Sequence, residues 1–300
     1  MIVAAVQSQE LADAVGAVRG VEMLVWPPGG DLPGRVEEIE FLVPDYLDAP
    51  AAMRQLGRLA SLRAVQLQSA GYDGLADLVP PGVDLLNARG VHDDATAELA
   101  LGLTIASLRG IDVAVRDMGH WQQEVERPSL ADSNVAILGY GSIGRSIALR
   151  MLACRARVTG VATAERDDDV VGRTVTSAQV DWSAQDVVVV VLPLSDATRG
   201  IVDAAFLARL HDGALVVNVG RGPLLDTSAV LAEAGRLSFA LDVTDPEPLP
   251  DGHPLWSAPG VLITPHIAGG TTAMLPRMAA LVRAQLESLR DGHPLRNVVR

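Results

Sequence analysis

The stretch Val135-Ala-Ile-Leu-Gly-Tyr-Gly-Ser-Ile-Gly144 joins an apolar run to three glycines in G-x-G-x-x-G spacing, and it decides the fold. The run predicts a buried strand, and the amphipathic pattern after the third glycine predicts a helix. Between them, Gly139 permits a tight turn, Gly141 lets the backbone approach a pyrophosphate, and Gly144 allows close helix packing. This context predicts a dinucleotide-binding turn rather than a structural turn that only looks similar.

Three later apolar runs each stop on polar residues, as buried strands of a parallel sheet would. In open α/β sheets the ligand crevice lies outside the carboxyl ends of the strands. We therefore expect an arginine, an aspartate and a histidine at the edge where a dinucleotide would lie, a layout for hydride transfer. The runs, with the residues that follow them, are Leu215–Val219 with Gly220-Arg221-Gly222, Phe239–Leu241 with Asp242, and Val261–Thr264 with Pro265-His266.

Beyond these segments, strand and helix patterns alternate. Val158–Val161 and Val187–Leu192 predict two more strands. A long amphipathic helix begins near Asp93, with Asp93, Asp94 or Thr96 as its N-cap. Alternating strands and helices predict an α/β fold with a doubly wound parallel sheet.

The first part of the chain, residues 1–91, predicts a smaller α/β unit. Pro-rich and Gly-rich turns separate its strand-like runs, and Ala51–Leu59 is its helical candidate. An amphipathic helix over Met274–Leu289 follows the second sheet and is expected to return to this first unit. The four expected strands are Ile2–Val6, Met23–Val25, Phe41–Val43 and Val65–Leu67.

The composition excludes several classes of function. The chain has 300 residues, 49% of them hydrophobic, which is enough for two domains of ordinary size. Its formal charge of −13 repels a phosphate backbone, so a nucleic-acid partner is not expected. All 24 basic residues are arginine, which excludes a lysine Schiff base. Cys154 is the only cysteine, and no His/Cys cluster suggests a metal site. The apolar runs are too short for a bilayer and the N-terminus lacks a signal-peptide pattern, so we expect a cytoplasmic protein with no membrane partner.

The residues after the second expected strand of the larger sheet bear on the identity of the dinucleotide. An NAD site usually carries an acid there, where this chain has Ala162. Thr163 and Arg166 offer a hydroxyl and a cation to a 2′-phosphate, so NADP is the preferred cofactor and NAD the alternative. In that alternative Glu165 binds the ribose, or Arg166 simply faces solvent. The acidic run Asp167-Asp168-Asp169 is interpreted as a solvated loop.

Five motifs, in this order, resemble those of the D-2-hydroxyacid dehydrogenase family, and within it the glyoxylate/hydroxypyruvate reductases. They are a substrate loop, an interdomain crossing, an arginine motif, a glutamate motif and a histidine motif. Their residues are Gln68-Ser69-Ala70-Gly71-Tyr72-Asp73, Asn87-Ala88-Arg89-Gly90 with Ala97-Glu98-Leu99-Ala100-Leu101, Asn218–Asp226, Ala240–Val243 with Glu247-Pro248-Leu249, and Thr264–Gly269.

The resemblance implies a fold, an assembly and a class of ligand. Residues 1–91 and 271–300 would form a flavodoxin-like substrate domain. Residues 92–270 would form a Rossmann dinucleotide-binding domain inserted into it. A homodimer through the cofactor domain is implied, and the expected substrate is a small 2-oxo or 2-hydroxy acid.

Carried over residue by residue, the resemblance makes Arg221 the substrate anchor, Glu247 the orienting carboxylate and His266 the acid/base. Reduction of a 2-oxo acid needs a hydride from a nicotinamide and a proton, which a histidine can supply near neutral pH. A carboxylate on the far ring nitrogen fixes the tautomer, and a guanidinium grips a carboxylate at two points. Backbone amides of the loop Ser69-Ala70-Gly71 would hold the other side of that carboxylate.

The resemblance also implies which residues contact the cofactor. Asp242 would bond the nicotinamide carboxamide, with a structural strand-end cap as the competing interpretation. His253 lies closer in sequence to Glu247 than His266 does, but it sits in a loop and is interpreted as structural. The expected cofactor-binding residues are Thr96, Gly139, Tyr140, Gly141, Ser142, Ile143, Gly144, Thr163, Arg166, Leu192, Pro193, Val219, Asp242 and Gly269.

Two other functions stay open beside 2-oxo acid reduction. Formate oxidation on the same fold typically uses glutamine where Glu247 stands, so Glu247 argues against it. A nucleotide-sensing binding protein of the same fold needs no catalysis. The set of Arg221, Glu247 and His266 does not exclude such a sensor but makes it less economical.

Overall fold

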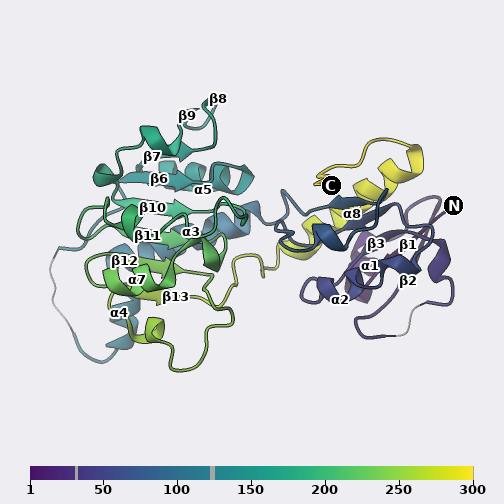
Figure 1. The fold of residues 1–300 in the computed structure, drawn as a ribbon, viewed down its shortest axis with the longest axis horizontal. Coiled ribbons are helices and arrows are strands. Elements are labelled where there is room, and N and C mark those ends of the chain that lie inside the picture. The colour runs from purple at the N-terminus through teal and green to yellow at the C-terminus, as the bar shows by residue number, and fades with distance from the viewer. Residues whose placement is uncertain (31–32, 122–125, 300) are drawn as a thin grey trace. The chain divides into compact units, whose positions relative to one another are not determined.

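The computed structural model describes residues 1–30, 33–121 and 126–299, and the chain divides into two compact units (Figure 1). The first unit comprises Met1–His92 with Thr271–Arg300, and the second unit comprises Asp93–Gly270. The first unit is therefore built from both ends of the chain, and the second from one continuous segment.

The first unit holds a five-stranded sheet in the order β2-β1-β3-β4-β5, and every neighbouring pair is parallel. An antiparallel bridge between Leu86 and Val298 brings the C-terminal segment to the β5 edge. The strands are β1 (Ile2–Val6), β2 (Val21–Val25), β3 (Ile39–Val43), β4 (Ala64–Gln66) and β5 (Asp84–Leu86), and the α-helices are α1 (Gln9–Val15), α2 (Ala49–Met53) and α8 (Met274–Asp291).

Strand periodicity explains why helices cover both faces of this sheet. Alternate side chains of a strand point to opposite faces, so an unbroken apolar run is buried on both. Ile2 and Val6 of β1 belong to one hydrophobic core with residues of α1 and α8, whereas Val3 and Ala5 belong to another with residues of α2. The expected return of the last helix to the first unit is confirmed, because α8 packs against α1.

The helix expected over Ala51–Leu59 is wrong in extent. α2 ends at Met53, and a separate 3-10 turn, η2, covers Leu56–Arg58. Gly57 lies inside the expected helix, where a glycine costs about 1 kcal/mol relative to alanine. Met53 and Leu56 are both buried in the same core, so two short turns bury the apolar side chains that one helix was expected to bury.

The second unit holds a six-stranded parallel sheet in the order β13-β12-β11-β10-β6-β7. From β6 the chain adds β7 on one side and then β10 to β13 on the other. This reversal is the signature of a doubly wound sheet, so the predicted fold class is confirmed. The strands are β6 (Asn134–Leu138), β7 (Arg157–Val161), β10 (Val187–Val190), β11 (Leu215–Asn218), β12 (Ser238–Leu241) and β13 (Val261–Ile263).

Helices lie on both faces of this second sheet. Val187 and Val189 of β10 belong to the core that contains α3 and α5 residues, whereas Val188 and Val190 belong to the core with α6 and α7 residues. No helix in the described part of the chain has the length and apolar character needed to cross a membrane. The helices are α3 (Asp93–Arg109), α4 (Ile111–Arg116), α5 (Ser142–Ala153), α6 (Ala204–Leu207) and α7 (Thr227–Glu233).

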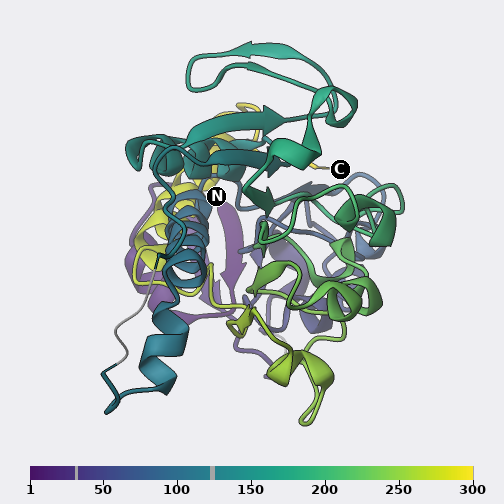
Figure 2. The same ribbon diagram turned by 90° about the vertical axis from the view of Figure 1, so that its left-hand side faces the viewer.

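An antiparallel hairpin, β8 (Arg166–Asp168) with β9 (Gly172–Thr174), follows β7 and extends beyond the sheet (Figure 2). The interpretation of Asp167-Asp168-Asp169 as a solvated loop is therefore wrong for the first two residues, which lie in β8, and is confirmed for Asp169, which lies exposed in the turn after β8. Thr174 is fully buried, and its hydroxyl accepts a hydrogen bond from the Arg166 amide at 3.0 Å. A short strand of charged residues has no apolar pattern from which it could be predicted.

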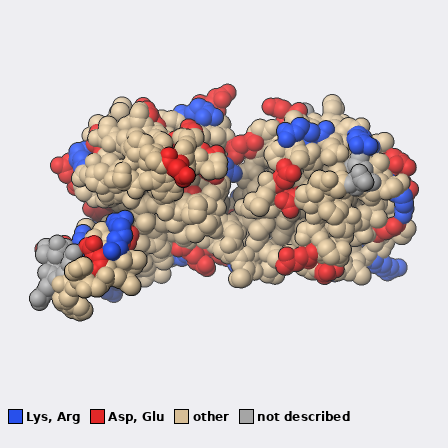
Figure 3. Space-filling view, turned by 90° about the horizontal axis from the view of Figure 1, so that it is seen from below, with Lys and Arg blue, Asp and Glu red and all other residues tan. Residues whose placement is uncertain are grey.

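Surface charge is dispersed where it can be seen. On the described part of the face shown in Figure 3, arginine side chains lie scattered among acidic ones and form no continuous basic patch. A continuous basic patch is the usual footprint of a nucleic-acid partner.

Candidate active site

The glycine turn between β6 and α5 leaves open space beside its backbone. Gly139 has φ +109°, and a Cβ there would lie 2.7 Å from the Val191 carbonyl carbon. A Cβ on Gly144 would lie 2.4 Å from the Gly139 carbonyl oxygen, so α5 packs directly on the turn. A Cβ on Gly141 would meet no described atom within 4 Å. A pyrophosphate fits such a space at the N-terminus of a twelve-residue helix.

The carboxyl ends of β10 and β11, the two strands that follow β6 on one side of the sheet, lie beside this turn. Gly139 approaches Val191 after β10, and a Cβ on Gly220 after β11 would lie 3.1 Å from the Leu192 carbonyl oxygen. The ends of β6, β10 and β11 therefore form one rim. Of the other expected cofactor-binding residues, Thr96 and Val219 are buried, Ser142, Ile143, Leu192 and Gly269 are half-buried, and Thr163 and Pro193 are exposed.

Tyr140, the second residue of the turn, fills a slot beside β7. It is 3% exposed, and a Cβ on Gly160 would lie 2.6 Å from its ring, so only a glycine at position 160 leaves room for the ring. The Tyr140 hydroxyl donates to Asp168 Oδ1 at 2.8 Å. Burial, and then this hydrogen bond, raises the pKa of Tyr140 well above its ordinary value. The ring is therefore neutral and fixed between β7 and β8.

Asp168 is the centre of this small network. Besides Tyr140, two amides of the β8–β9 turn donate to its Oδ1 at 2.9 and 3.1 Å, and Arg145 of α5 lies 3.7 Å from its Oδ2. Burial opposes ionisation of Asp168, but these donors together hold its pKa below its ordinary value. Arg145 also pairs with Asp169 at 2.5 Å. Asp168 thus ties the hairpin to the glycine turn and to α5.

Glu165 and Arg166 differ in their partners, which bears on the choice between NAD and NADP. The Glu165 carboxylate lies 2.6 Å from Gln179 and 2.6 Å from Arg173; the Gln179 hydrogen bond, and then the Arg173 charge, lower its pKa. Arg166 donates to the Tyr140 carbonyl and lies 5.9 Å from the centroid of the Tyr140 ring. Among the described residues it forms no ion pair, so its charge is uncompensated by a carboxylate.

Glu247 and His266 form an acid–base pair beyond the carboxyl ends of β12 and β13. His266 Nδ1 lies 2.5 Å from Glu247 Oε1, and the two side chains are 41% and 39% exposed. An ionised carboxylate only accepts hydrogen bonds, so the shared proton belongs to Nδ1. In the described part of the chain Nε2 has no hydrogen-bond partner, as in histidines that exchange protons with a ligand.

The loop that carries His266 has an uncommon backbone conformation. His266 has φ +52°, in the left-handed region, which costs a residue other than glycine about 1–3 kcal/mol. Asp242 holds the loop in place. Its carbonyl accepts from the His266 amide at 2.8 Å, and its carboxylate accepts from the Thr264 hydroxyl and the amides of Ile267 and Ala268 at 2.7, 2.9 and 3.0 Å. Backbone strain of this kind clusters at active sites.

These contacts give Asp242 a structural role. The residue is 1% exposed, and both of its carboxylate oxygens accept hydrogen bonds from the His266 loop. A carboxylate oxygen can accept more than one hydrogen bond, so the expected contact of Asp242 with a nicotinamide carboxamide stays a prediction beside this role.

Arg221 lies on the turn after β11, and this turn packs on the segment that follows β12. A Cβ on Gly222 would lie 1.8 Å from the Thr244 carbonyl oxygen, so the two segments touch through their backbones. Asn218 shapes the turn, because its Nδ2 donates to the Arg221 carbonyl at 2.9 Å and its Oδ1 accepts from the Gly220 amide at 3.1 Å. Arg221, Glu247 and His266 thus follow three adjacent strands, and Glu247 and His266 contact each other directly.

The loop Ser69-Ala70-Gly71 belongs to the first unit and follows β4. Its carbonyl groups all accept hydrogen bonds from within that unit. In the described part of the chain, its amide N–H groups find no acceptor. Unpaired backbone amides are suited to binding an anion.

Several contacts could not be anticipated from the motifs alone. The Tyr140–Asp168–Arg145 network is one of them; a tyrosine inside the glycine turn and a glycine in the next strand were its only signals.

His253 accepts a hydrogen bond from the Leu255 amide at 3.3 Å and caps a short 3-10 turn, the kind of role its structural interpretation implies. No group of three or more His, Cys, Asp or Glu within the described ranges is placed to hold a metal ion.

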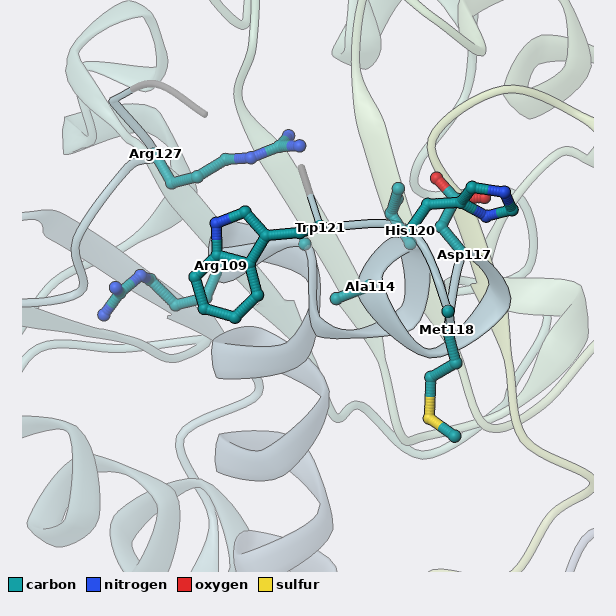
Figure 4. Close-up of a pocket in the computed structure, with 10 residues that line it drawn as sticks. Arg109, Ala114, Asp117, Met118, His120, Trp121 and Arg127 are labelled. Atoms are coloured by element: carbon teal, nitrogen blue, oxygen red, sulfur yellow. The ribbon is translucent and has the colours of Figure 1, made fainter. Parts of the chain in front are cut away.

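The segment from α4 onward exposes large apolar side chains. Ile111, Val115, Met118 and Trp121 are 47, 61, 77 and 95% exposed. Met118 and Trp121 also line a hollow whose wall includes Arg127 (Figure 4). A cluster of exposed apolar side chains is typical of an interaction surface.

Comparison with known proteins gives the family context. Residues 101–268 match the family model described as D-isomer specific 2-hydroxyacid dehydrogenase, NAD binding domain. An uncharacterized protein in the proB 3′ region of Corynebacterium melassecola is 34% identical over 247 residues, 78% of this chain and 81% of that protein. The glyoxylate reductase of Thermofilum pendens is 28% identical over 267 residues, 84% of this chain and 77% of that protein. The crystal structure of the NADPH-dependent glyoxylate/hydroxypyruvate reductase of Sinorhizobium meliloti, in complex with NADP and sulfate, aligns with a TM-score of 0.83 at 26% identity, over 100% of this chain and 98% of that chain.

Proposed function

The chain belongs to the D-isomer specific 2-hydroxyacid dehydrogenase family and is an NAD(P)-dependent dehydrogenase, and from this premise we propose that it interconverts small 2-oxo acids and D-2-hydroxy acids through Arg221, Glu247 and His266. The contact between His266 and Glu247 at the strand edge carries the proposal. Glyoxylate and hydroxypyruvate are the first substrates to test, because relatives with those names share the fold.

The proposal divides the work between the two units. The second unit, Asp93–Gly270, binds the dinucleotide, which the match of residues 101–268 to an NAD-binding domain supports. The first unit, Met1–His92 with Thr271–Arg300, contributes the loop Ser69-Ala70-Gly71, whose unpaired amides suit a substrate carboxylate.

His266 is the proposed acid/base. Glu247 accepts the proton of Nδ1 and so keeps Nε2 available for the substrate oxygen. In the reducing direction Nε2 donates a proton to the oxygen of the 2-oxo group, and in the oxidising direction it accepts the proton of the hydroxyl. Glu247 stabilises the imidazolium that is present while Nε2 and Nδ1 are both protonated.

Arg221 is the proposed anchor. A guanidinium can bind a carboxylate at two points and polarise the carbonyl beside it. Asn218 and Gly222 fix the backbone that carries this side chain, so the position of Arg221 depends on the packing of two turns.

The nicotinamide, when bound, supplies or accepts the hydride. The open space at Gly141 and the N-terminus of α5 suit the pyrophosphate of the dinucleotide, and Gly139, Leu192 and Gly220 form the adjoining rim. We propose that NADPH is preferred over NADH, because Arg166 has no carboxylate partner among the residues that the structure describes, whereas Glu165 is engaged by Gln179 and Arg173.

The cofactor preference can be tested by titrating each reduced dinucleotide into Arg166→Gln. Loss of one charge-assisted phosphate contact should weaken NADPH binding about tenfold or more and leave NADH binding unchanged. An equal change for both dinucleotides would contradict recognition of the 2′-phosphate by Arg166.

A panel of 2-oxo acids, run with NADPH and NADH, tests the activity itself. The panel contains glyoxylate, hydroxypyruvate, pyruvate and longer 2-oxo acids, with formate and NADP⁺ as a separate arm. Saturable cofactor oxidation with at least one 2-oxo acid is expected. Tight cofactor binding without turnover of any of them would favour a nucleotide-sensing protein.

We also propose that the chain forms a homodimer and that the exposed apolar segment of α4 and its surroundings takes part in it. Met118 and Trp121 are the most exposed of its large side chains. The variant Met118→Glu/Trp121→Glu should halve the mass measured by light scattering, whereas Leu47→Glu, at an 87% exposed site in the first unit, should not. A wild-type mass of one chain would contradict the dimer.

A cytoplasmic location of the protein stays a prediction.

A further inference from the structure

The loop Ser69-Ala70-Gly71 is held through its carbonyl groups by the segment 87–92. His92 Nε2 donates to the carbonyl of the preceding residue, Gln68, at 2.7 Å. Asn87 Nδ2 donates to the Ala70 carbonyl at 2.8 Å, and between them the Ala88 amide donates to the Ser69 carbonyl at 2.8 Å. Three successive carbonyl groups are therefore fixed.

Peptide planarity turns these bonds into a constraint on the amides. In a trans peptide the C=O of one residue and the N–H of the next point in opposite directions. Fixing the carbonyls of Gln68, Ser69 and Ala70 therefore directs the N–H groups of the next residues, as far as Gly71, away from their donors. Within the described residues these N–H groups have no acceptor, so all three stay available to a ligand.

We infer that Asn87 and His92 are positioning residues that orient the loop amides for the carboxylate of the substrate. The inference rests on the proposed function, which assigns that carboxylate to the loop. Asn87 is 9% and His92 is 5% exposed, so both act through the loop rather than by touching the substrate. Donors that are already oriented avoid the ordering cost that a mobile loop would incur on binding.

His92 offers a clean test because its ring makes a single hydrogen bond with the residues that the structure describes. The Gln68 carbonyl can only accept, so Nε2 carries the proton. Nδ1 is buried and has no hydrogen-bond partner in the described part of the chain. Apart from that bond, the ring packs 5.8 Å from the Tyr46 ring, centroid to centroid. Phenylalanine at this position would keep an aromatic ring and remove the donor, whereas glutamine would keep a donor.

Asn87 offers a second, independent variant. Its Oδ1 accepts from the Arg89 amide at 3.2 Å, and Asn87→Asp keeps that acceptor. The same substitution replaces the Nδ2 donor by a carboxylate oxygen, which repels the Ala70 carbonyl. The shape of the side chain is unchanged, so the substitution removes the donor without changing the volume that the side chain fills.

The experiment compares a substrate that has the carboxylate with one that lacks it. The kcat/KM of the NADPH-loaded protein is measured for glyoxylate and for glycolaldehyde, in which CH₂OH replaces the carboxylate. The Kd of oxamate, an unreactive carboxylate of similar shape, is measured alongside. We expect His92→Phe and Asn87→Asp to lower the preference for glyoxylate about tenfold, mainly through KM, and to weaken oxamate binding about tenfold.

Two further variants separate positioning from stability. His92→Gln should stay within about threefold of the wild type, since it retains a donor. Val15→Ala, a core truncation in α1, should lower thermal stability without changing either ratio. Equal losses on both substrates in His92→Phe and Asn87→Asp would mean that the two residues only stabilise the fold, and would overturn the inference.

Failure of the inference and failure of the proposed function give different results. Unchanged selectivity and unchanged oxamate binding in both variants would overturn the positioning role while leaving the proposed function intact. A wild-type protein that binds NADPH but neither reduces glyoxylate nor binds oxamate would overturn both.

Discussion

Two carboxylates at the carboxyl edge of the second sheet each hydrogen-bond to a side chain that carries a proton, Glu247 to His266 and Asp168 to Tyr140. The surroundings of the two pairs differ. Glu247 lies 2.5 Å from His266 Nδ1, and about two fifths of each side chain is exposed. Asp168 lies 2.8 Å from the hydroxyl of Tyr140, which is 3% exposed. Asp168 also has amide donors and Arg145, whereas Glu247 has no second hydrogen bond among the described residues.

The difference separates a pair that can exchange protons with a ligand from a pair that fixes the fold. Tyr140 has a raised pKa because it is buried and bonded to Asp168, so it keeps its proton at neutral pH. His266 has an exposed ring and a second nitrogen without a protein partner in the described ranges. A carboxylate beside a histidine or a tyrosine therefore indicates acid–base catalysis only where one side of the pair is exposed to a ligand, as it is for Glu247 and His266.

The largest expected effect is that of His266→Ala. Loss of the acid/base should lower kcat about 10²- to 10⁴-fold and leave the Kd of NADPH unchanged, because the imidazole acts mainly in the transition state. Steady-state kinetics and a binding titration measure the two quantities. His211→Ala, at a half-buried histidine outside the proposed site, is the control and should retain activity. Activity of His266→Ala comparable to that of the wild type would contradict the proposal that the Glu247–His266 pair, unlike the Asp168–Tyr140 pair, exchanges a proton with the substrate.

Gly222→Ala should come next, because a Cβ at this position would lie 1.8 Å from the Thr244 carbonyl. The arginine turn must then separate from the segment after β12, so activity should fall at least about tenfold and the free energy of unfolding by about 1–3 kcal/mol. Gly102→Ala, inside α3 with nothing near its Cβ, should instead stabilise by about 0.5–1 kcal/mol. Denaturant titration tests both, and equal effects would refute the close approach.

Tyr140→Phe should have a smaller effect. It removes one of several hydrogen bonds to Asp168 while keeping the ring beside Gly160, so unfolding free energy should fall by about 1 kcal/mol. Tyr72→Phe, at a 37% exposed site, is the matched control and should change little. A normal stability in Tyr140→Phe would mean that the hairpin does not depend on this contact.

The smallest expected effect is on acid stability. The folded protein holds the pKa of Asp168 below its ordinary value, so its contribution is present above about pH 4 and is lost as pH falls through the lowered pKa. Urea unfolding at steps from about pH 6 to about pH 3 should show a decline that is shallower in Asp168→Asn. An identical pH dependence in the variant would contradict the assignment.

The sequence predicted the strand edge that carries Glu247 and His266 better than the buried contact between Tyr140 and Asp168. The apolar runs and Gly139, Gly141 and Gly144 each obey a local rule, so the doubly wound sheet could be predicted. Glu247 and His266 came from motifs, and their roles stay predictions although the structure places them in contact. β8 could not be predicted, because charged residues form it and its partners lie on other elements.

Burial and long-range pairing account for the other differences. Asp242 ends an apolar run, which is typical of either a ligand contact or a cap, and its hydrogen bonds to the His266 loop could not be predicted from that run. Asn87 and His92 stand about twenty residues from the loop they hold, beyond the reach of any periodicity rule. The helix expected over Ala51–Leu59 is wrong in extent because Gly57 weakens a continuous helix there, and α2 ends at Met53 before the separate turn η2.

The proposed role of the Glu247–His266 pair in reducing a 2-oxo acid can be tested directly. The most direct measurement mixes the protein, saturated with NADPH, with hydroxypyruvate in a single turnover and follows nicotinamide absorbance and product chirality. Loss of the absorbance with formation of D-glycerate is the predicted result. Persistent absorbance with the cofactor bound, or formation of the L product, would contradict the account.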